Sequence, residues 1–367
     1  MNYGIVIVNV HDIIDLRLAS MSPENNSKVT ILDVAKLCGV SYQTVSRVIN
    51  NSPEVSAKTR RSVLKAIKEL GYHPNQLARS LKTRRSSILE VITFGVETFI
   101  PRELIIAMSR ASIEHGYSLM FTDIPQDDPE EENRLFAHLN SGLCDGAILT
   151  APVESKLFDK ITADPPLLPI IQIRNQRGSV APSVIIDQYY GSQLATQHLL
   201  DLGHRRIAEI CAPLCYHEAL TRHTAFVDTL NTCGLSPSDY VEAGEWMPRD
   251  GYMAANLLLD RCARFSGLII SNDYLALGAI LALNERGLRI PEDISIVGFD
   301  DAPESAYYMP PLTTIRQDYE ALGTESIHYL VELINNQETS THQRVLTPQL
   351  ITRQSTKVID PISIDRA

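Results

Sequence analysis

Four polar side chains recur along one side of the segment "SYQTVSRVIN", which lies near the N-terminus. If residues 42–50 are helical, Val45, Val48 and Ile49 fall at i, i+3 and i+4 and form a buried stripe. The residues that then point outward are Gln43, Ser46, Arg47 and Asn50. An arginine can donate two parallel hydrogen bonds to guanine O6 and N7, and a glutamine can pair with adenine N6 and N7. The chemistry available on this face is therefore hydrogen bonding to the edges of nucleic-acid bases.

Three helices are predicted to hold this face in place. Side chains that can cap a helix precede each of them, and glycines follow the first and the third. The caps are Thr30 with Asp33, Ser41 and Ser56; the helices cover 31–38, 42–50 and 57–70; the glycines are Gly39 and Gly71. The apolar face of the third helix is Val63, Leu64, Ile67 and Leu70. Two short helices joined by a tight turn and supported by a third are typical of a helix-turn-helix, although a three-helix bundle with a polar face fits the same pattern.

The same region is basic in an otherwise acidic chain. Residues 28–85 contain twelve lysines and arginines against three acidic residues, a net charge of +9, whereas the chain as a whole carries −11. The remainder therefore carries −20. A basic module on an acidic body indicates a polyanionic partner for the module alone, although a solvated charged surface is also common.

The motifs "DVAKLCGVS", "TVSRVIN", "VSAKTR", "LGYHPN" and "ARSL" follow one another through this basic segment. In their order and spacing they resemble the DNA-binding headpiece of the lac repressor family (LacI/GalR). The resemblance implies a helix-turn-helix domain over 28–73, in which Tyr42, Gln43 and Arg47, a triplet of the lac type, read base edges. It also implies a palindromic, lac-like operator bound by a homodimer.

A polar, basic linker follows at residues 74–87, after Pro74 breaks the third helix. By the resemblance it contains a hinge helix that orders on the operator, with Asn75, Ala78 and Leu81 against the DNA. Leu81 matches the family leucine that wedges into the central base step, a known way to kink DNA. A plain apolar contact within a linker is the alternative for Leu81.

From residue 88 the pattern changes to short apolar runs that alternate with amphipathic stretches. The runs read as buried parallel strands at 88–94, 117–122, 145–150, 167–173, 206–212, 266–271 and 294–300. Helices such as "RELIIAMSRASIEHG" and "DYLALGAILALNERG" lie between them. Repeated units of this kind indicate a doubly wound α/β fold, which binds ligands at the carboxyl ends of its strands.

The resemblance continues to about residue 356, through "LGHRRIAEI" and "ISNDYLALGAILALNERGLRIPEDISIVGFDD". It implies an α/β effector-binding and dimerisation domain over 88–357, with two lobes similar to periplasmic sugar-binding proteins and three chain crossings between them. We place lobe 1 at about 88–187 and 317–346, and lobe 2 at about 188–316 and 347–357.

Six residues are carried over by this resemblance as contacts to a small effector. Arg222, Asn272 and Asp300 match a polar clamp for hydroxyl groups, which suits a sugar because each charged group can engage two neighbouring hydroxyls. The further contacts are Trp246, Tyr319 and Glu154, with Thr98 and Pro101 near the cleft entrance. Trp246 would cover the C–H face of a sugar, or else pack in the core. Tyr274 departs from the family pattern, so the identity of the effector stays open.

No catalytic motif is found, and neither an enzyme nor a cofactor is expected. "HEALT" at 217–221 lacks the second histidine of a zinc protease, because Thr221 stands in its place. The six cysteines include no Cys-x-x-Cys pair, so no metal site is expected. No apolar run reaches the roughly 18 residues of a membrane span, which predicts no membrane partner and a cytoplasmic, nucleoid-associated protein.

Residues 1–27 are predicted to be a disordered extension, and Met21 is an alternative start codon to Met1. The chain ends in "STKVIDPISIDRA", without the leucine heptads of a tetramerising helix, so we expect a dimer. The resemblance therefore implies a transcriptional repressor that a small sugar-like effector releases allosterically from its operator. Two alternatives to this function remain open. One is a regulator that needs a purine or another small metabolite as corepressor. The other is a sugar-binding receptor without a role on DNA.

Overall fold

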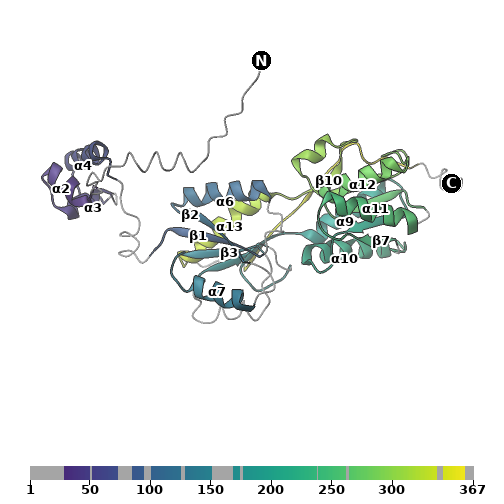
Figure 1. Cartoon of the computed structure of the whole chain (residues 1–367), viewed down its shortest axis with the longest axis horizontal. Coiled ribbons are helices and arrows are strands. Elements are labelled where there is room, and N and C mark those ends of the chain that lie inside the picture. The colour runs from purple at the N-terminus through teal and green to yellow at the C-terminus, as the bar shows by residue number, and fades with distance from the viewer. Residues whose placement is uncertain are drawn as a thin grey trace, which may run out of the picture. The chain divides into compact units, whose positions relative to one another are not determined.

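The computed structural model describes residues 29–49, 52–72, 85–94, 101–124, 129–150, 168–173, 177–237, 239–261, 264–336 and 342–359. The chain divides into two compact units, one up to Arg84 and one from Arg85 onward. We call the first the headpiece and the second the body (Figure 1). No helix among the described residues is long and apolar enough to cross a membrane.

The headpiece contains the three predicted helices with the predicted caps. They are α2 (Ile31–Cys38), α3 (Tyr42–Ile49) and α4 (Ala57–Leu70). The Asp33 carboxylate accepts a hydrogen bond of 2.8 Å from the Thr30 N–H, while the hydroxyls of Ser41 and Ser56 each accept one of 3.2 Å from the amide three residues on. Gly39 and Gly71 end α2 and α4 with φ of 63° and 60°, a conformation that glycine adopts without strain.

Valine and alanine side chains form the core of the headpiece. Its buried members are Val34, Ala35, Val45, Val48, Val63 and Ala66. The prediction for α4 is wrong at Leu64, which is 51% exposed. Ala66 is buried instead of Leu64. It lies three residues after Val63, about one helical turn, and so faces the same side as that valine.

The body contains two six-stranded sheets, each with strand order 2-1-3-4-5 followed by a sixth strand. The sheet of lobe 1 runs β11-β5-β4-β3-β1-β2. Its strands are β1 (Ile88–Phe94), β2 (Ser118–Ile124), β3 (Gly146–Leu149), β4 (Ile170–Gln172), β5 (Ser183–Ile186) and β11 (Gln343–Leu346). Helices α6 (Arg102–Glu114) and α13 (Tyr319–Ile334) cover one face, and α7 (Pro129–Leu139) covers the other (Figure 1).

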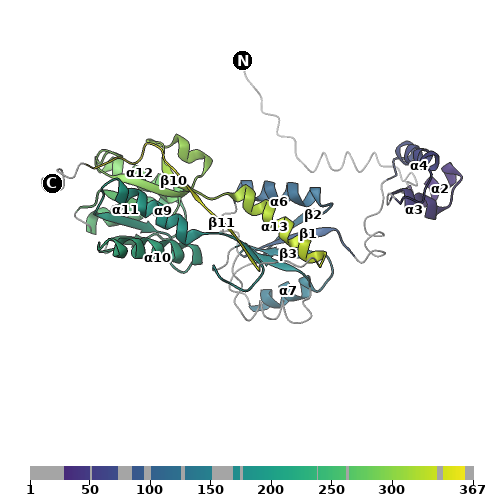
Figure 2. The same cartoon turned by 180° about the vertical axis from the view of Figure 1, so that it is seen from behind.

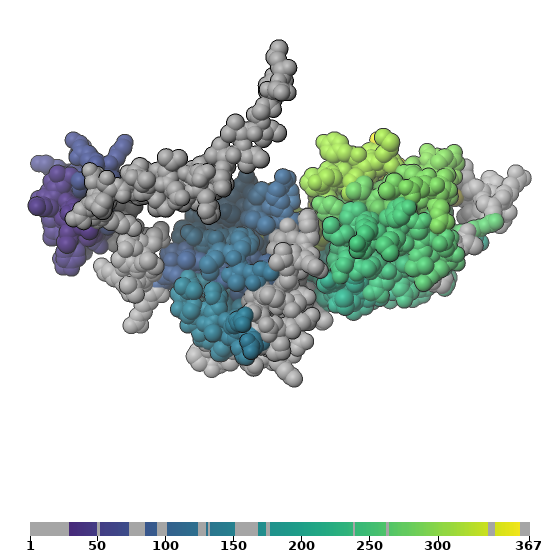
Figure 3. Space-filling view, in the orientation of Figure 1, coloured from purple at the N-terminus to yellow at the C-terminus, as the bar shows by residue number. Residues whose placement is uncertain are grey.

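The sheet of lobe 2 runs β12-β10-β9-β8-β6-β7. Its strands are β6 (Ile207–Cys211), β7 (Tyr240–Glu242), β8 (Gly267–Ile270), β9 (Ser295–Asp300), β10 (Thr313–Arg316) and β12 (Gln349–Ile351). Helices α9 (Gln188–Asp201) and α10 (His217–Thr232) lie on one face, with α11 (Pro248–Arg261) and α12 (Asp273–Glu285) on the other. Figure 3 shows the lobes as separate blue and green masses.

The chain passes between the lobes at three places, which Figure 2 shows from behind. The passages lead from β5 to α9, from β10 to α13 and from β11 to β12. The first and third are joined where the Asp187 N–H donates to the Leu346 carbonyl at 3.0 Å. The first and second are joined where the Gln188 amide donates to Gln317 Oε1 at 2.7 Å.

All seven apolar runs predicted as strands are strands, within a few residues at their ends. Strands β5, β7, β10 and β11 were not indicated by the pattern, because three or four residues are too few to show a period. Every pairing is parallel except that of β10 with β12.

Candidate functional site

The outward face of α3 is polar and exposed, as its spacing predicts. Tyr42 is 52% exposed, and Gln43 and Arg47 are exposed as well, while Ser46 is half-buried. Arg47 Nε lies 3.4 Å from Glu54 Oε2, with both side chains more than half exposed. Such a surface pair contributes about 0–1 kcal/mol, so it costs little to exchange it for a base contact.

Helix α4 fixes the end of α3 through Arg60. Its guanidinium donates to the Ser52 carbonyl at 2.5 Å and to the Val48 carbonyl at 3.5 Å. Val48 is itself buried in the headpiece core. The polar face of α3 is therefore presented by a rigid support, as a recognition element requires. The other predicted DNA contacts, Asn50, Asn75, Ala78 and Leu81, lie outside the described residues.

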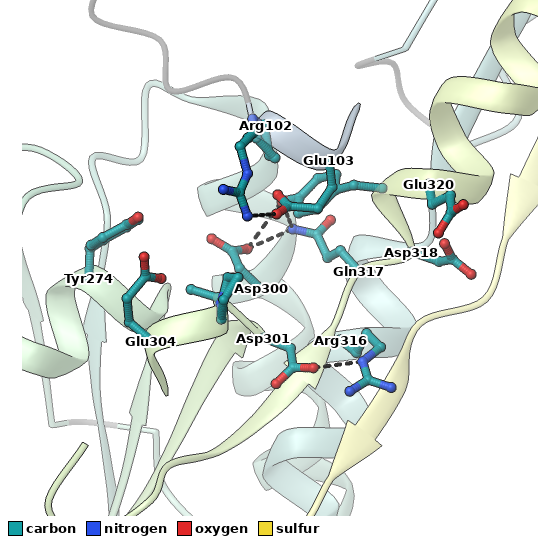
Figure 4. A pocket seen from close by; sticks show the side chains of 14 residues that line it. Arg102, Glu103, Tyr274, Asp300, Asp301, Glu304, Arg316, Gln317, Asp318 and Glu320 are labelled. Atoms are coloured by element: carbon teal, nitrogen blue, oxygen red, sulfur yellow. Dashed lines mark hydrogen bonds and ion pairs between the residues drawn. The ribbon is translucent and has the colours of Figure 1, made fainter. Parts of the chain in front are cut away.

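The body holds a cavity of about 610 Å³ beside the passage from β10 to α13 (Figure 4). Its wall comes from the N-terminal end of α6, the segment after β9 and the start of α13. The predicted contacts Asp300 and Tyr319 line it, and so do Pro101 and Tyr274. The cavity thus lies next to the carboxyl end of a parallel strand, where open α/β sheets bind ligands.

Acidic side chains dominate the charged groups of this wall. Six carboxylates and two guanidinium groups line the cavity: Glu103, Asp300, Asp301, Glu304, Asp318 and Glu320 with Arg102 and Arg316. Arg316 Nε donates to Asp301 Oδ2 at 2.6 Å, and Arg102 lies 3.1 Å from Glu103. Both cations are therefore already paired with carboxylates. The wall favours neutral or cationic ligands over anions.

Asp300 is the centre of a hydrogen-bonded chain at the cavity wall. It ends β9 with φ of 107°, a left-handed conformation that aspartate tolerates better than most residues. Its Oδ1 accepts from the Gln317 amide at 2.7 Å, and the same amide lies 2.7 Å from the Tyr319 hydroxyl. Gln317 also accepts from Gln188. The side chain of Asp300 is thereby tied to two of the three passages between the lobes.

Arg222 lies behind Asp300, in the interior of lobe 2. Its guanidinium donates to Gln188 Oε1 at 2.9 Å and to the Ser271 carbonyl, and its Nη2 lies 3.7 Å from Asp300 Oδ1. The side chain is 6% exposed and stacks on Phe299, 3.7 Å from the ring centroid. Other protein groups therefore surround this cation. Arg222 does not itself line the cavity, but it contacts Asp300, which does.

Trp246 lies close to Arg222 and Asn272 contacts Trp246, and neither residue is part of the cavity lining. The Trp246 ring centroid is 5.7 Å from the Arg222 guanidinium carbon, and its ring packs on Tyr216. Asn272 is buried and caps α12, with its Oδ1 accepting from the Leu275 N–H at 2.7 Å. Its amide donates to the Trp246 carbonyl at 3.3 Å.

Asp273, the next residue, is a fully buried carboxyl close to Asp300. The Thr314 hydroxyl donates to its Oδ1 at 2.6 Å, and the Ala302 N–H donates to its Oδ2 at 2.8 Å. Burial, and then the nearby charge of Asp300, raise the pKa of Asp273 to about 8. This raised pKa favours the neutral, protonated form of the carboxyl at pH 7 in the folded protein.

Comparison with known proteins places both units in one family. Residues 30–75 match the family model "Bacterial regulatory proteins, lacI family", and residues 196–356 match "Periplasmic binding protein-like domain". The chain is 37% identical over 337 residues to the HTH-type transcriptional repressor PurR of Haemophilus influenzae (strain PittEE), an alignment that covers 90% of this chain and 99% of that protein. The chain belongs to the LacI family.

Two further comparisons are with lac repressor. The lactose operon repressor of Escherichia coli (strain K12) is 32% identical over 328 residues, which cover 89% of this chain and 91% of that protein. A crystal structure of the lac repressor dimer bound to operator and the anti-inducer ONPF matches with a TM-score of 0.83 and 32% identity, over 90% of this chain and 100% of that one. The protein is thus a DNA-binding transcriptional repressor of the LacI family, with a helix-turn-helix headpiece and a two-sheet periplasmic-binding-like body.

The structure of this LacI-family protein brings five of the six predicted effector contacts into one neighbourhood. Asp300 and Tyr319 line the cavity, and Arg222 and Trp246 follow behind Asp300. Asn272 is adjacent to Trp246, whereas Glu154 and Thr98 lie outside the described residues.

Sequence reasoning missed the two glutamines of this LacI-family site, Gln188 and Gln317. Each stands at a passage between the lobes. Gln188 follows an aspartate in "DQYYG", and Gln317 precedes one in "RQDYE". Their position at the junction of a strand and the helix that follows it was the available signal.

Proposed function

We propose that the protein represses transcription as a homodimer on a palindromic operator of the lac type, and that a small sugar-like effector bound in the body releases it. The observation that carries the DNA half of the proposal is the exposed polar face of α3 on a rigid three-helix core. Tyr42, Gln43 and Arg47 on that face are the side chains that we assign to base edges, with Ser46 and Asn50 beside them.

The acidic wall of the cavity supports a neutral effector with several hydroxyl groups. Carboxylates accept hydrogen bonds from neighbouring hydroxyls and repel anions such as phosphorylated compounds. One relative at 32% identity is the lactose operon repressor, whose name concerns a sugar. The second candidate is a purine corepressor, which is favoured by the 37% identity to PurR and by the aromatic rings of Tyr274 and Tyr319 in the wall.

Switching would act through the hydrogen-bonded chain that joins the lobes. An effector that binds Asp300 competes with Gln317 and Arg222 for the same carboxylate, and so changes the contacts between two passages of the chain. A differential affinity of about 1–3 kcal/mol between lobe arrangements is typical of such coupling. The effector must bind the two arrangements unequally, because equal affinity would shift nothing.

A second copy of the chain would cover exposed leucines on α12. Leu277 and Leu281 are 40% and 54% exposed, four residues apart on one side of this helix. The lac repressor that matches by structure is a dimer on its operator.

We propose further that the protein is cytoplasmic and nucleoid-associated, and that it acts by binding and not by catalysis.

Fluorescence anisotropy on a labelled lac-type palindrome tests the whole proposal. At fixed salt, we expect the full-length protein to bind this DNA more tightly than a scrambled duplex, and a galactoside, glucoside or pentose to release it. Tightening by a purine would establish the corepressor candidate instead. Equal affinity for both duplexes would contradict the lac-type operator.

Light scattering of the same sample tests the dimer. We expect two chains per particle, and four would contradict the dimer.

Replacing Arg47 by alanine is expected to cost about 1–3 kcal/mol of operator affinity and to relax base choice, because one bidentate base contact is lost. Lys65→Ala is the matched control, since this lysine is exposed on α4 and paired with Glu69. Anisotropy titrations of both variants on the palindrome and the scrambled duplex measure the specificity ratio. An unchanged ratio in Arg47→Ala would show that α3 does not read bases as assigned.

A further inference from the structure

Lobe 2 contains a second group of reactive side chains, separate from the cavity. Glu209 and Cys211 come from β6, and His223 comes from α10. One carboxylate oxygen, the thiol sulfur and one imidazole nitrogen all lie within 4.8 Å of one another. Glu209 and Cys211 are fully buried, and the His223 side chain is 15% exposed. The contacts to Asp300 described above use none of the three.

The fold brings these residues together for a simple reason. Glu209 and Cys211 are two apart on a strand, so both side chains point to the same face of the sheet. Helix α10 covers that face, and His223 Nδ1 lies 2.5 Å from Glu209 Oε2. The neighbouring strand β7 pairs Tyr240 with Glu209 and Glu242 with Cys211. Tyr240 packs on the His223 ring at 4.7 Å, and Glu242 is exposed.

Without a metal ion, Glu209 and His223 balance each other's charge across their 2.5 Å contact. A buried carboxylate needs a compensating charge, and a bare one is costly. Among the described residues, His223 is the ionisable group that pairs with Glu209, and no ion pair there joins Glu209 to a lysine or an arginine. A divalent ion would instead be balanced by the carboxylate and a Cys211 thiolate, with a neutral imidazole as the third ligand.

The donor types select the ion. A thiolate and an imidazole are ligands of zinc and related transition metals, whereas magnesium and calcium prefer oxygen ligands alone. Zinc is held at about 2.0–2.3 Å by such donors, so ligand atoms within 4.8 Å of one another need small side-chain rotations to enclose it. Strand β7 is the edge of its sheet, so an ion can reach the group from the side of the exposed Glu242.

We propose that Glu209, Cys211 and His223 form a binding site for a zinc-class transition-metal ion, with water or Glu242 in the fourth position. The bound ion would join α10 to β6. His223 directly follows Arg222, whose guanidinium contacts Asp300, so the ion would hold the helix that carries this cation. Metal binding should therefore stabilise lobe 2, because a ligand that binds only the folded state raises the free energy of unfolding.

The test uses full-length protein that has been treated with a chelator and dialysed. Cobalt(II) is titrated as the spectroscopic probe, and zinc is then added to displace it. We expect one cobalt ion per chain, with the near-ultraviolet charge-transfer band of a thiolate ligand and the visible bands of a tetrahedral site. Zinc should abolish both sets of bands and raise the midpoint of thermal unfolding.

Matched cysteine variants separate this site from other thiols. Cys211→Ser should lose the charge-transfer band and weaken zinc binding roughly tenfold or more, because even the loss of a group that only supports a metal ligand costs about 10- to 100-fold in affinity. Cys215→Ser, which changes an exposed free cysteine four residues away, should keep both. If Cys211→Ser fails to fold, His223→Gln should keep the thiol but lose tight binding. Binding of cobalt without a thiolate band, or equal loss in Cys215→Ser, would overturn the proposal and leave a buried Glu209–His223 pair.

Discussion

Replacing Arg222 by methionine is expected to lower the free energy of unfolding by about 3–5 kcal/mol and to abolish the response to effector. The guanidinium is buried and donates to Gln188 and Ser271 while it faces Asp300. Methionine keeps the packing on Phe299 but leaves these acceptors without a donor and Asp300 without its cation. Losing this guanidinium is costly because the acceptors on Gln188 and Ser271 lose their donor, and Asp300 keeps its hydrogen bond from Gln317 but not the nearby positive charge.

Two measurements check this result. Denaturant unfolding of the body gives the stability, and anisotropy on operator DNA gives the response to whichever compound releases the wild type. Operator affinity without effector should be nearly unchanged, because the headpiece is a separate compact unit. Thr224→Ala, an exposed change on the same helix α10, is the control and should alter neither quantity. A methionine variant that is still released by effector would show that Arg222 has no part in the switch.

Replacing Asp273 by asparagine is expected to remove a pH dependence of stability worth several kcal/mol. Burial and the charge of Asp300 raise the pKa of Asp273 to about 8 in the folded state, against an ordinary value of 3.8. The folded protein keeps this proton to higher pH than the unfolded chain. The stabilising contribution is therefore fully present below about pH 4 and is lost as the pH rises to about 8. Each unit of difference corresponds to about 1.4 kcal/mol.

An asparagine fits this position without a titrating group. Its carbonyl oxygen can accept from the Ala302 N–H, and its amide can donate to the Thr314 hydroxyl, which rotates to accept. The free energy of unfolding, measured from pH 4 to pH 8, should slope less in this variant than in the wild type. Asp260→Asn, at an exposed aspartate of α11, is the control and should keep the wild-type slope. Equal slopes for Asp273→Asn and the wild type would contradict a neutral buried carboxyl.

Local patterns in the sequence determined much of the architecture. The caps at Thr30, Ser41 and Ser56 predicted three helices that the headpiece contains, because capping and apolar spacing act within a few residues. The longer buried strands were predicted for the same reason, since a continuous apolar run can be recognised without knowing which strands pair with it. Leu64 was predicted wrongly, because which side of an amphipathic helix meets the core depends on the other two helices.

The sequence by itself determined the family and the identity of most residues around the candidate sites. The motifs of the headpiece led to the polar face of α3, and the resemblance in the body led to Arg222 and Asp300. Only the tertiary structure decided how these residues are used. It ties Asp300 to Gln317 and Gln188 at the passages between the lobes, and it pairs Glu209 of β6 with His223 of α10. The physical reason is that sheet pairing and helix packing set the distances between residues far apart in the chain, and no local pattern records them.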